Sequence, residues 1–234
     1  MGLLENINLV IFDMDGVIFD IVNAVRETVK RGIEKYKLNT NFQDAMQQVS
    51  HLLEIAQSLA LPEMVLQSKE LFDIPLFGDI TVLQRLRIAA SMYSDFRELK
   101  EQSGLVPNID SVIKQLVEHG KKLVILSNNA KVNVEEVLKK FDLEQYFSDI
   151  IGFNEVSKTK PDPEGILKIL EQEKIPSENT LFIGDMVSDC QAGAAANVKT
   201  IIISTGLVAK DKLVEARPFK LVENVEGLRS VLFN

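Results

Sequence analysis

Four short segments that are almost entirely apolar constrain the fold of this chain more than any other feature. A strand is continuously rather than alternately apolar when both of its faces are buried. Segments with the spacing of amphipathic helices separate these runs along most of the chain. The alternation predicts an α/β fold, a doubly wound, Rossmann-like parallel sheet covered by helices. The four predicted strands are residues 9–12, 123–126, 181–183 and 200–203.

One long stretch, residues 18–102, interrupts this alternation. It contains several helical patterns and no convincing buried strand, and Pro62 and the Pro-containing region 75–78 break the patterns. We therefore expect residues 18–102 to form an inserted α-helical cap domain and residues 1–17 and 103–234 to form the Rossmann-like core. The predicted cap helices are residues 22–36, 42–59, 63–72 and 81–99.

Charge and composition narrow the classes of partner and compartment. The 234 residues carry a formal net charge of −8 and no dense Lys/Arg cluster, which disfavours nucleic acid as a main partner. No segment approaches the roughly 18 consecutive apolar residues of a membrane span. The first residues lack the pattern of a signal peptide, and the single Cys190 excludes an intrachain disulfide. We expect a cytoplasmic protein without membrane partners, and the sequence leaves a homodimer open.

Two carboxylates follow the first predicted strand directly. Asp13 and Asp15 should emerge at the carboxyl end of that strand, and Gly16 permits a tight turn with its N–H exposed. Paired acids beside a flexible turn suit phosphoryl chemistry. The alternative is an ordinary Asp-rich turn after a strand.

Polar groups at two further positions could bind an anion. Ser127 and Asn128, with Asn129, follow the second predicted strand, where they suit either an anion or the start of the next helix. Lys160 precedes the turn that begins at Pro161, and the proline would restrict where the lysine can reach. The alternative for this segment is a helix cap with its lysines solvated.

A second acidic pair follows the third predicted strand. Asp185 comes directly after Gly184 at the strand's end, and Asp189 lies four residues later. Four residues on a turn can bring both carboxylates toward one cation, and the position of Asp185 favours metal binding. For Asp189, stabilisation of the start of a helix predicted over residues 190–197 is the stronger alternative.

Taken in order, these motifs resemble the signature of the haloacid dehalogenase superfamily. That signature is Asp-x-Asp-Gly after the first strand, then Ser or Thr, then Lys, then Gly-Asp-x-x-x-Asp. The position of the helical insertion resembles the cap of the phosphoglycolate phosphatase and β-phosphoglucomutase branch. The chain departs from many of these relatives at Ile21, which follows Asp20 where they have Ser.

The resemblance implies a phosphatase that acts on small phosphorylated metabolites with Mg²⁺ as cofactor. Asp13 would attack phosphorus and form an aspartyl-phosphate. Asp15 would protonate the leaving oxygen and later deprotonate water. Relatives that dehalogenate lack this second acid, so Asp15 favours phosphoester chemistry.

The resemblance also implies which residues bind phosphate and metal. The phosphoryl oxygens would contact Gly16, Ser127, Asn128 and Lys160, and Lys160 would also offset charge in the transition state. The predicted metal ligands are Asp13, Asp15 through its backbone carbonyl, Asp185 and, directly or through a neighbour, Asp189.

Two other functions remain open at this stage. A phosphomutase of the β-phosphoglucomutase kind would keep the same core but pass the phosphoryl group to a second sugar hydroxyl. A noncatalytic binding or regulatory protein could use the same scaffold without turnover.

Overall fold

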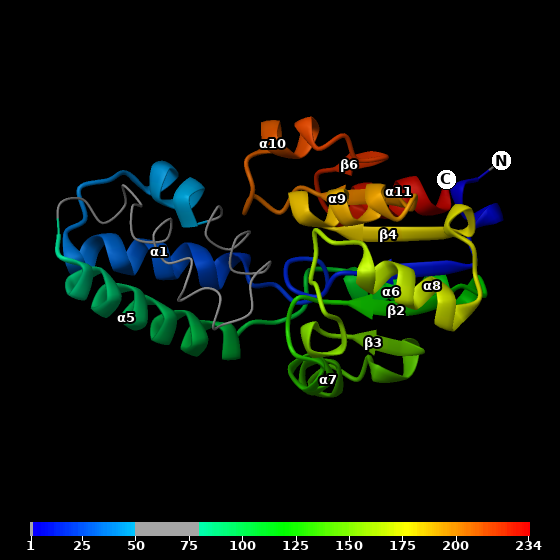
Figure 1. Ribbon diagram of the computed structural model, residues 1–234, viewed down its shortest axis with the longest axis horizontal. Coiled ribbons are helices and arrows are strands. Elements are labelled where there is room, and N and C mark those ends of the chain that lie inside the picture. Colours follow the sequence, from blue (N-terminus) through cyan, green and yellow to red (C-terminus); the bar gives the residue numbers. More distant parts are fainter. Residues whose placement is uncertain (1, 50–79) are drawn as a thin grey trace. The chain divides into compact units, whose positions relative to one another are not determined.

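The computed structural model describes residues 2–49 and 80–234, which divide into two compact units (Figure 1). One unit combines the chain up to Phe19 with Leu105–Asn234, and the other is formed by the described part of Asp20–Gly104. That these units act as catalytic core and cap remains a prediction.

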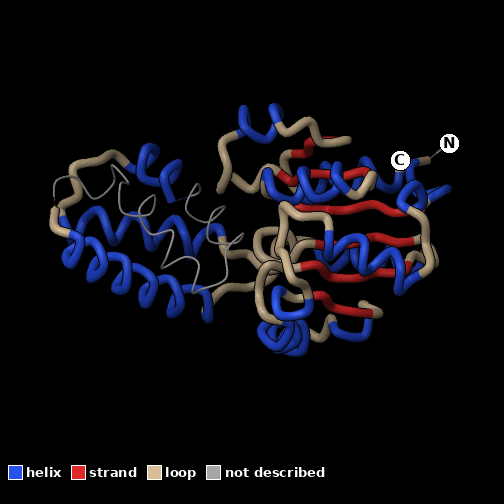
Figure 2. Tube along the Cα trace, in the orientation of Figure 1, coloured by secondary structure: helices blue, strands red, loops and turns tan. Residues whose placement is uncertain are grey.

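The first unit is built on a six-stranded, wholly parallel sheet with the strand order β3-β2-β1-β4-β5-β6 (Figure 2). The four predicted strands are confirmed as β1, β2, β4 and β5. The sequence reading missed β3 and β6, which have three residues each and lie at the two edges of the sheet. The strands are β1 Leu9–Phe12, β2 Lys122–Leu126, β3 Asp149–Ile151, β4 Thr180–Gly184, β5 Lys199–Ile203 and β6 Lys220–Val222.

The strand order reverses between β1 and β4. After β1 the chain adds β2 and β3 on one side, then crosses back to add β4, β5 and β6 on the other. Phe12, the last residue of β1, pairs with Ile125 of β2 and Ile183 of β4, so these three strands end at nearly the same level. The carboxyl ends of strands beside such a reversal are where open α/β sheets bind ligands.

Helices cover the sheet on both faces. Right-handed crossovers place α6 and α7 on one face and α8 and α9 on the other. Leu9, Ile11 and Phe182 form one buried cluster with Ile166 of α8 and Ala192 of α9. The helix predicted from Cys190 begins earlier, at Val187. The helices of this unit are α6 Ile109–Glu118, α7 Lys131–Lys140, α8 Glu164–Glu173, α9 Val187–Ala195, α10 Lys210–Glu215 and α11 Val225–Phe233, with short 3-10 turns η1 Leu3–Asn6, η3 Glu144–Tyr146, η4 Phe153–Glu155 and η5 Ser177–Asn179.

The described part of the second unit is helical. It contains α1 Val22–Tyr36, a helix over residues 42–49, and α5 Val82–Glu101, and α1 packs against α5. Thr81 begins α5 by accepting a hydrogen bond from the Gln84 N–H at 3.3 Å. The predicted helices 22–36 and 81–99 are confirmed, the prediction for 42–59 is confirmed over 42–49, and the prediction for 63–72 lies outside the described residues.

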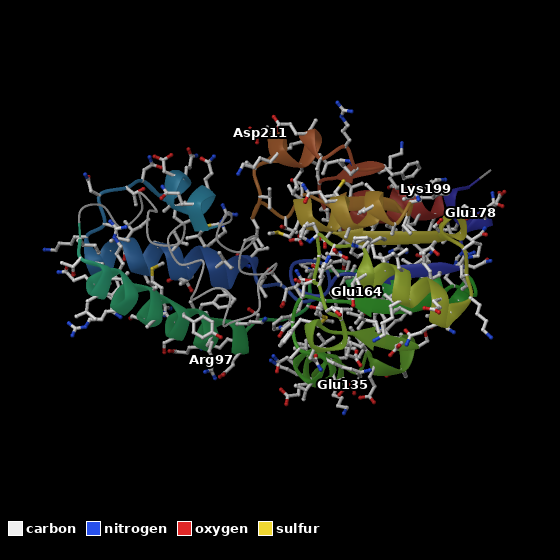
Figure 3. All side chains as sticks on the ribbon, in the orientation of Figure 1. Arg97, Glu135, Glu164, Glu178, Lys199 and Asp211 are labelled. Atoms are coloured by element: carbon white, nitrogen blue, oxygen red, sulfur yellow. The ribbon has the colours of Figure 1, made fainter. Side chains whose placement is uncertain are left out.

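The surface of the described chain carries many charged side chains. Glu178, Lys199 and Asp211, for example, are exposed (Figure 3). Among residues 2–49 and 80–234, no helix has the length and apolar character needed to cross a membrane.

Candidate active site

The loop after β1 presents the first acid of the site. Asp13 is 4% exposed, and its N–H donates to the carbonyl of Ile183 at 2.8 Å, which continues the pairing of β1 with β4. The turn then closes at Gly16, whose N–H donates to the Phe19 carbonyl at 2.8 Å. Gly16 has a φ of +91°, and a Cβ there would lie 2.2 Å from Asp185 Oδ2. Glycine is therefore required both by the backbone and by the close approach of Asp185.

Lys160 brings a buried positive charge to Asp13. Its Nζ lies 2.7 Å from Asp13 Oδ1 and 2.7 Å from Asp189 Oδ1, and its side chain is 2% exposed. The Asn128 side chain holds the backbone of this residue, because Asn128 Nδ2 donates to the Lys160 carbonyl at 3.2 Å and the Lys160 N–H donates to Asn128 Oδ1 at 3.1 Å. Two loops distant in sequence thus fix where the ammonium points.

The loop from β4 into α9 supplies the second acidic pair. Asp189 lies in the first turn of α9, and its Oδ2 accepts the backbone N–H groups of Asp185 and Met186, both at 3.0 Å. Thr205, in the loop after β5, donates to Asp185 Oδ2 at 3.0 Å. Asp185 Oδ1 is buried and has no hydrogen-bond partner among the described residues. One oxygen of Asp185 is therefore held by protein, and the other needs a partner that the described chain does not supply.

The electrostatics of this cluster favour a cation. Burial, together with the neighbouring charge of Asp189, raises the pKa of Asp13 to about 7, although Lys160 opposes the increase. Burial, with the charges of Asp13 and Asp189, raises the pKa of Asp185 well above its usual range. For Lys160, burial lowers the pKa, but the carboxylates of Asp13 and Asp189 outweigh it and raise the pKa overall. Three buried carboxylates thus share one ammonium, and additional positive charge would stabilise them.

The carboxylates also fit a metal by position. Ligand atoms of Asp13, Asp185 and Asp189 all lie within 4.8 Å of one another. An all-oxygen set of this kind suits hard divalent cations such as Mg²⁺. A divalent cation here would give Asp185 Oδ1 the partner that the described residues do not supply. It would also offset the negative charge by which the three carboxylates exceed the single Lys160 ammonium.

The residues predicted to hold phosphate lie around the same strand ends. Ser127 is buried directly after β2, and its Oγ accepts the Asn129 N–H at 3.1 Å. The polar atoms of the Asn128 side chain pair with the backbone of Lys160, and the Gly16 N–H pairs with Phe19. The structure therefore gathers the predicted residues, while the phosphate contacts of Gly16, Ser127, Asn128 and Lys160 remain predictions.

Sequence reasoning gave no role to Thr205, and it considered Asn129 only with Ser127 and Asn128, as a group that could bind an anion or begin a helix. Thr205 contacts Asp185, as described above, and Asn129 Nδ2 donates to Asp15 Oδ2 at 3.3 Å. Both residues follow the carboxyl end of a predicted strand by a few positions. The rule that pointed to Asp13 and Asp185 could therefore have pointed to them as well.

Comparison with known proteins identifies the family. Residues 10–203, well over half of the chain, match the model of the haloacid dehalogenase-like hydrolases. The chain belongs to this family. A phosphoglycolate phosphatase of Escherichia coli K12 is 24% identical over 99% of this chain and 95% of its own length.

Solved structures of similar proteins share the fold. A predicted phosphoglycolate phosphatase from Haemophilus somnus 129PT superposes with a TM-score of 0.69 at 16% identity, covering 97% of this chain and 99% of its own. A structure provisionally named beta-phosphoglucomutase, from Thermotoga maritima, has a TM-score of 0.65 at 22% identity and covers 96% of this chain and 98% of its own. The predicted family, its branch and the Rossmann-like α/β fold are confirmed.

Proposed function

We propose that this protein hydrolyses a small phosphorylated metabolite, of the phosphoglycolate or sugar-phosphate type, with Mg²⁺ and through an aspartyl-phosphate on Asp13. The predicted class of enzyme, a phosphatase of the haloacid dehalogenase-like family, is confirmed by the match to the family and by relatives named as phosphatases. The buried contact of Lys160 with Asp13 and Asp189, beside Asp185 at the reversal of the sheet, is the observation that supports the mechanism.

The first half of the proposed reaction forms a bond between an Asp13 oxygen and phosphorus. The ester bond between phosphorus and the leaving oxygen breaks, and that oxygen takes a proton from Asp15. Lys160 holds Asp13 through Oδ1 and lowers the repulsion between the carboxylate and an anionic ester.

The second half returns the enzyme to its starting state. A water molecule gives its proton to Asp15 and attacks phosphorus, and the bond between phosphorus and Asp13 breaks. Inorganic phosphate leaves, Asp13 is again a carboxylate, and Asp15 again carries a proton. The inserted helical domain would exclude bulk water and select the leaving group.

The proposed metal ligands are Asp13, the backbone carbonyl of Asp15, and Asp185, with Asp189 supporting the site. Mg²⁺ would neutralise negative charge shared by the carboxylates and the phosphate. Asp189 fits a supporting role, because one of its oxygens holds the Asp185 and Met186 N–H groups while the other faces Lys160.

Ser127 and Lys160 are the proposed phosphate-binding side chains, with contributions from Gly16 and Asn128. For Asn128, the paired contacts with Lys160 support a second task, which is to keep the lysine at the phosphate site. A cytoplasmic location and the absence of nucleic-acid and membrane partners remain predictions from the sequence, which leaves a homodimer open.

A hydrolysis screen of phosphorylated metabolites, run with Mg²⁺ and with EDTA, tests the proposal. The wild-type protein is compared with Asp13→Asn and with Asp211→Asn, an exposed aspartate that serves as matched control. We expect phosphate release that depends on Mg²⁺, disappears in Asp13→Asn and persists in Asp211→Asn.

Two outcomes would replace this proposal by one of the alternatives. Isomerised sugar phosphate in place of inorganic phosphate would identify a phosphomutase. No turnover of any compound in a broad panel, with wild type and Asp13→Asn alike, would favour a noncatalytic protein on the same scaffold.

A further inference from the structure

Asn129 lies beside the acid that the proposed reaction needs, although no motif of the sequence singles it out from Asn128. Its Nδ2 donates to Asp15 Oδ2 at 3.3 Å, and both residues are half-buried. We propose that Asn129 is a positioning residue that orients the carboxyl group of Asp15 toward the leaving group. This inference rests on the proposed function, in which Asp15 is the general acid.

The backbone of Asn129 is fixed from two directions. Its N–H donates to Ser127 Oγ at 3.1 Å, and its carbonyl accepts the N–H of Phe153, in η4, at 3.0 Å. The absence of a side chain at Gly152 leaves room for this second contact, because a Cβ at Gly152 would lie only 2.9 Å from the Asn129 carbonyl oxygen. The residue is thus held between the loop after β2 and the turn after β3.

The carboxamide of Asn129 has one favourable orientation. Its Oδ1 accepts the backbone N–H of Ala130 at 2.8 Å and the Nδ2 of Asn133 at 2.8 Å. If Oδ1 and Nδ2 exchanged places, the NH₂ group would face the N–H donors of Ala130 and Asn133. The side-chain oxygen would then face the Asp15 carboxylate, and both contacts would be repulsive. These contacts therefore direct the NH₂ group of Asn129 to Asp15.

The donation restricts how the Asp15 carboxyl group can rotate, because the amide that holds one of its oxygens is itself fixed by the contacts above. An amide N–H takes no part in acid–base exchange, so Asn129 cannot replace Asp15 as the acid. It orients the carboxyl group for transfer of a proton to the leaving oxygen.

A series of para-substituted phenyl phosphates tests this role, because the need for a proton donor grows as the phenol becomes less acidic. Asn129→Asp keeps the size and the accepting Oδ1 but loses the donor, and Asn129→Ala removes both. We expect each to lower kcat/KM, which reports the steps up to release of the phenol, about tenfold or more for phenyl phosphate and less than about threefold for p-nitrophenyl phosphate. Asp15→Asn should show the same trend with larger losses.

Two comparisons separate positioning from general damage to the fold. Glu136→Ala changes an exposed residue of α7, the helix that follows Asn129, and it should change kcat/KM less than about threefold for every substrate. Adding Asn129→Asp to Asp15→Asn should cause almost no further loss for phenyl phosphate, because the two residues act through one proton transfer. An equal loss across the series, or additive losses, would overturn the role of Asn129.

A crystal structure of Asn129→Ala gives a readout that does not need turnover. A changed or split conformation of the Asp15 side chain supports the inference, and an unchanged conformation overturns it. Failure of the proposed function is distinct, because wild type, Asp13→Asn and the Asn129 variants would then all fail to release phosphate.

Discussion

Replacing Lys160 by methionine removes the buried ammonium that contacts both Asp13 and Asp189 while retaining an unbranched side chain. Breaking a buried ion pair by removing one partner costs about 3–5 kcal/mol, because the remaining charge stays desolvated. Here two carboxylates lose their contact at 2.7 Å, so we expect the free energy of unfolding of the metal-free protein to fall by about that amount.

The pH of the experiment follows from the two pKa shifts. Asp13 is mostly ionised at pH about 8, above its pKa of about 7. The folded pKa of Lys160 is raised above the ordinary value of 10.5, so its contribution is fully present below 10.5 and is lost only at higher pH. Urea unfolding in EDTA at pH about 8 therefore reports the whole effect.

Lys158→Met is the matched control. The side chain of Lys158 is 73% exposed, and its Nζ lies 3.5 Å from Asp162 Oδ2. Exposed ion pairs of this kind contribute under about 1 kcal/mol to the free energy of unfolding. Mg²⁺ should stabilise Lys160→Met at least as strongly as wild type, because it supplies charge to the same carboxylates. A loss of stability in Lys160→Met no larger than in Lys158→Met would refute the reasoning.

Three further predictions concern the metal and the turn beside it. In EDTA the free energy of unfolding should fall as pH rises from about 4 to about 7, by at most about 1.4 kcal/mol per pH unit for each of Asp13 and Asp185. The reason is that these folded carboxyl groups keep protons that the unfolded chain releases near pH 3.8, and urea unfolding with Mg²⁺ should show a smaller decline. Thr205→Val should weaken Mg²⁺ binding in calorimetry about 10-fold or more and Thr205→Ser should restore it, whereas equal affinities would contradict the role of this hydroxyl. Gly16→Ala should abolish Mg²⁺ binding and phosphate release, because the added Cβ would collide with the Asp185 carboxylate and displace it. Gly120→Ala, at a φ of +69° with no atom within 4 Å, should lose only about 1–3 kcal/mol of stability, and similar activities of the two variants would contradict the account.

The sequence predicts those parts of the fold in which burial determines residue type. β1, β2, β4 and β5 are central or nearly central strands, and their continuous apolar runs follow from burial on both faces. β3 and β6 have three residues each at the sheet edges, too short to be distinguished from loop. The start of α9 was predicted three residues too late, because Asp189 was taken to precede the helix, whereas it lies in the first turn of a helix that begins at Val187.

The candidate site was predictable where a functional side chain directly follows a strand. Asp13 and Asp185 occupy such positions, and the register of β1 with β4 brings them together. The contact of Asn128 with Lys160 joins residues 32 positions apart, and no local pattern predicts such a pairing. Thr205 and Asn129 belong to loops whose path depends on neighbouring strands and turns, so their partners emerge only from the folded chain.

Phosphorylation of Asp13 during turnover is the most direct test of the central claim. Asp15→Asn should still be phosphorylated by p-nitrophenyl phosphate, whose leaving group needs little proton donation, but it should lose the phosphoryl group slowly because the base for water is missing. Acid quenching followed by peptide mass spectrometry should then find the phosphoryl group on Asp13, together with a stoichiometric burst of nitrophenol. A phosphoryl group on another residue, or steady release of phosphate with no phosphorylated enzyme, would contradict the proposed mechanism.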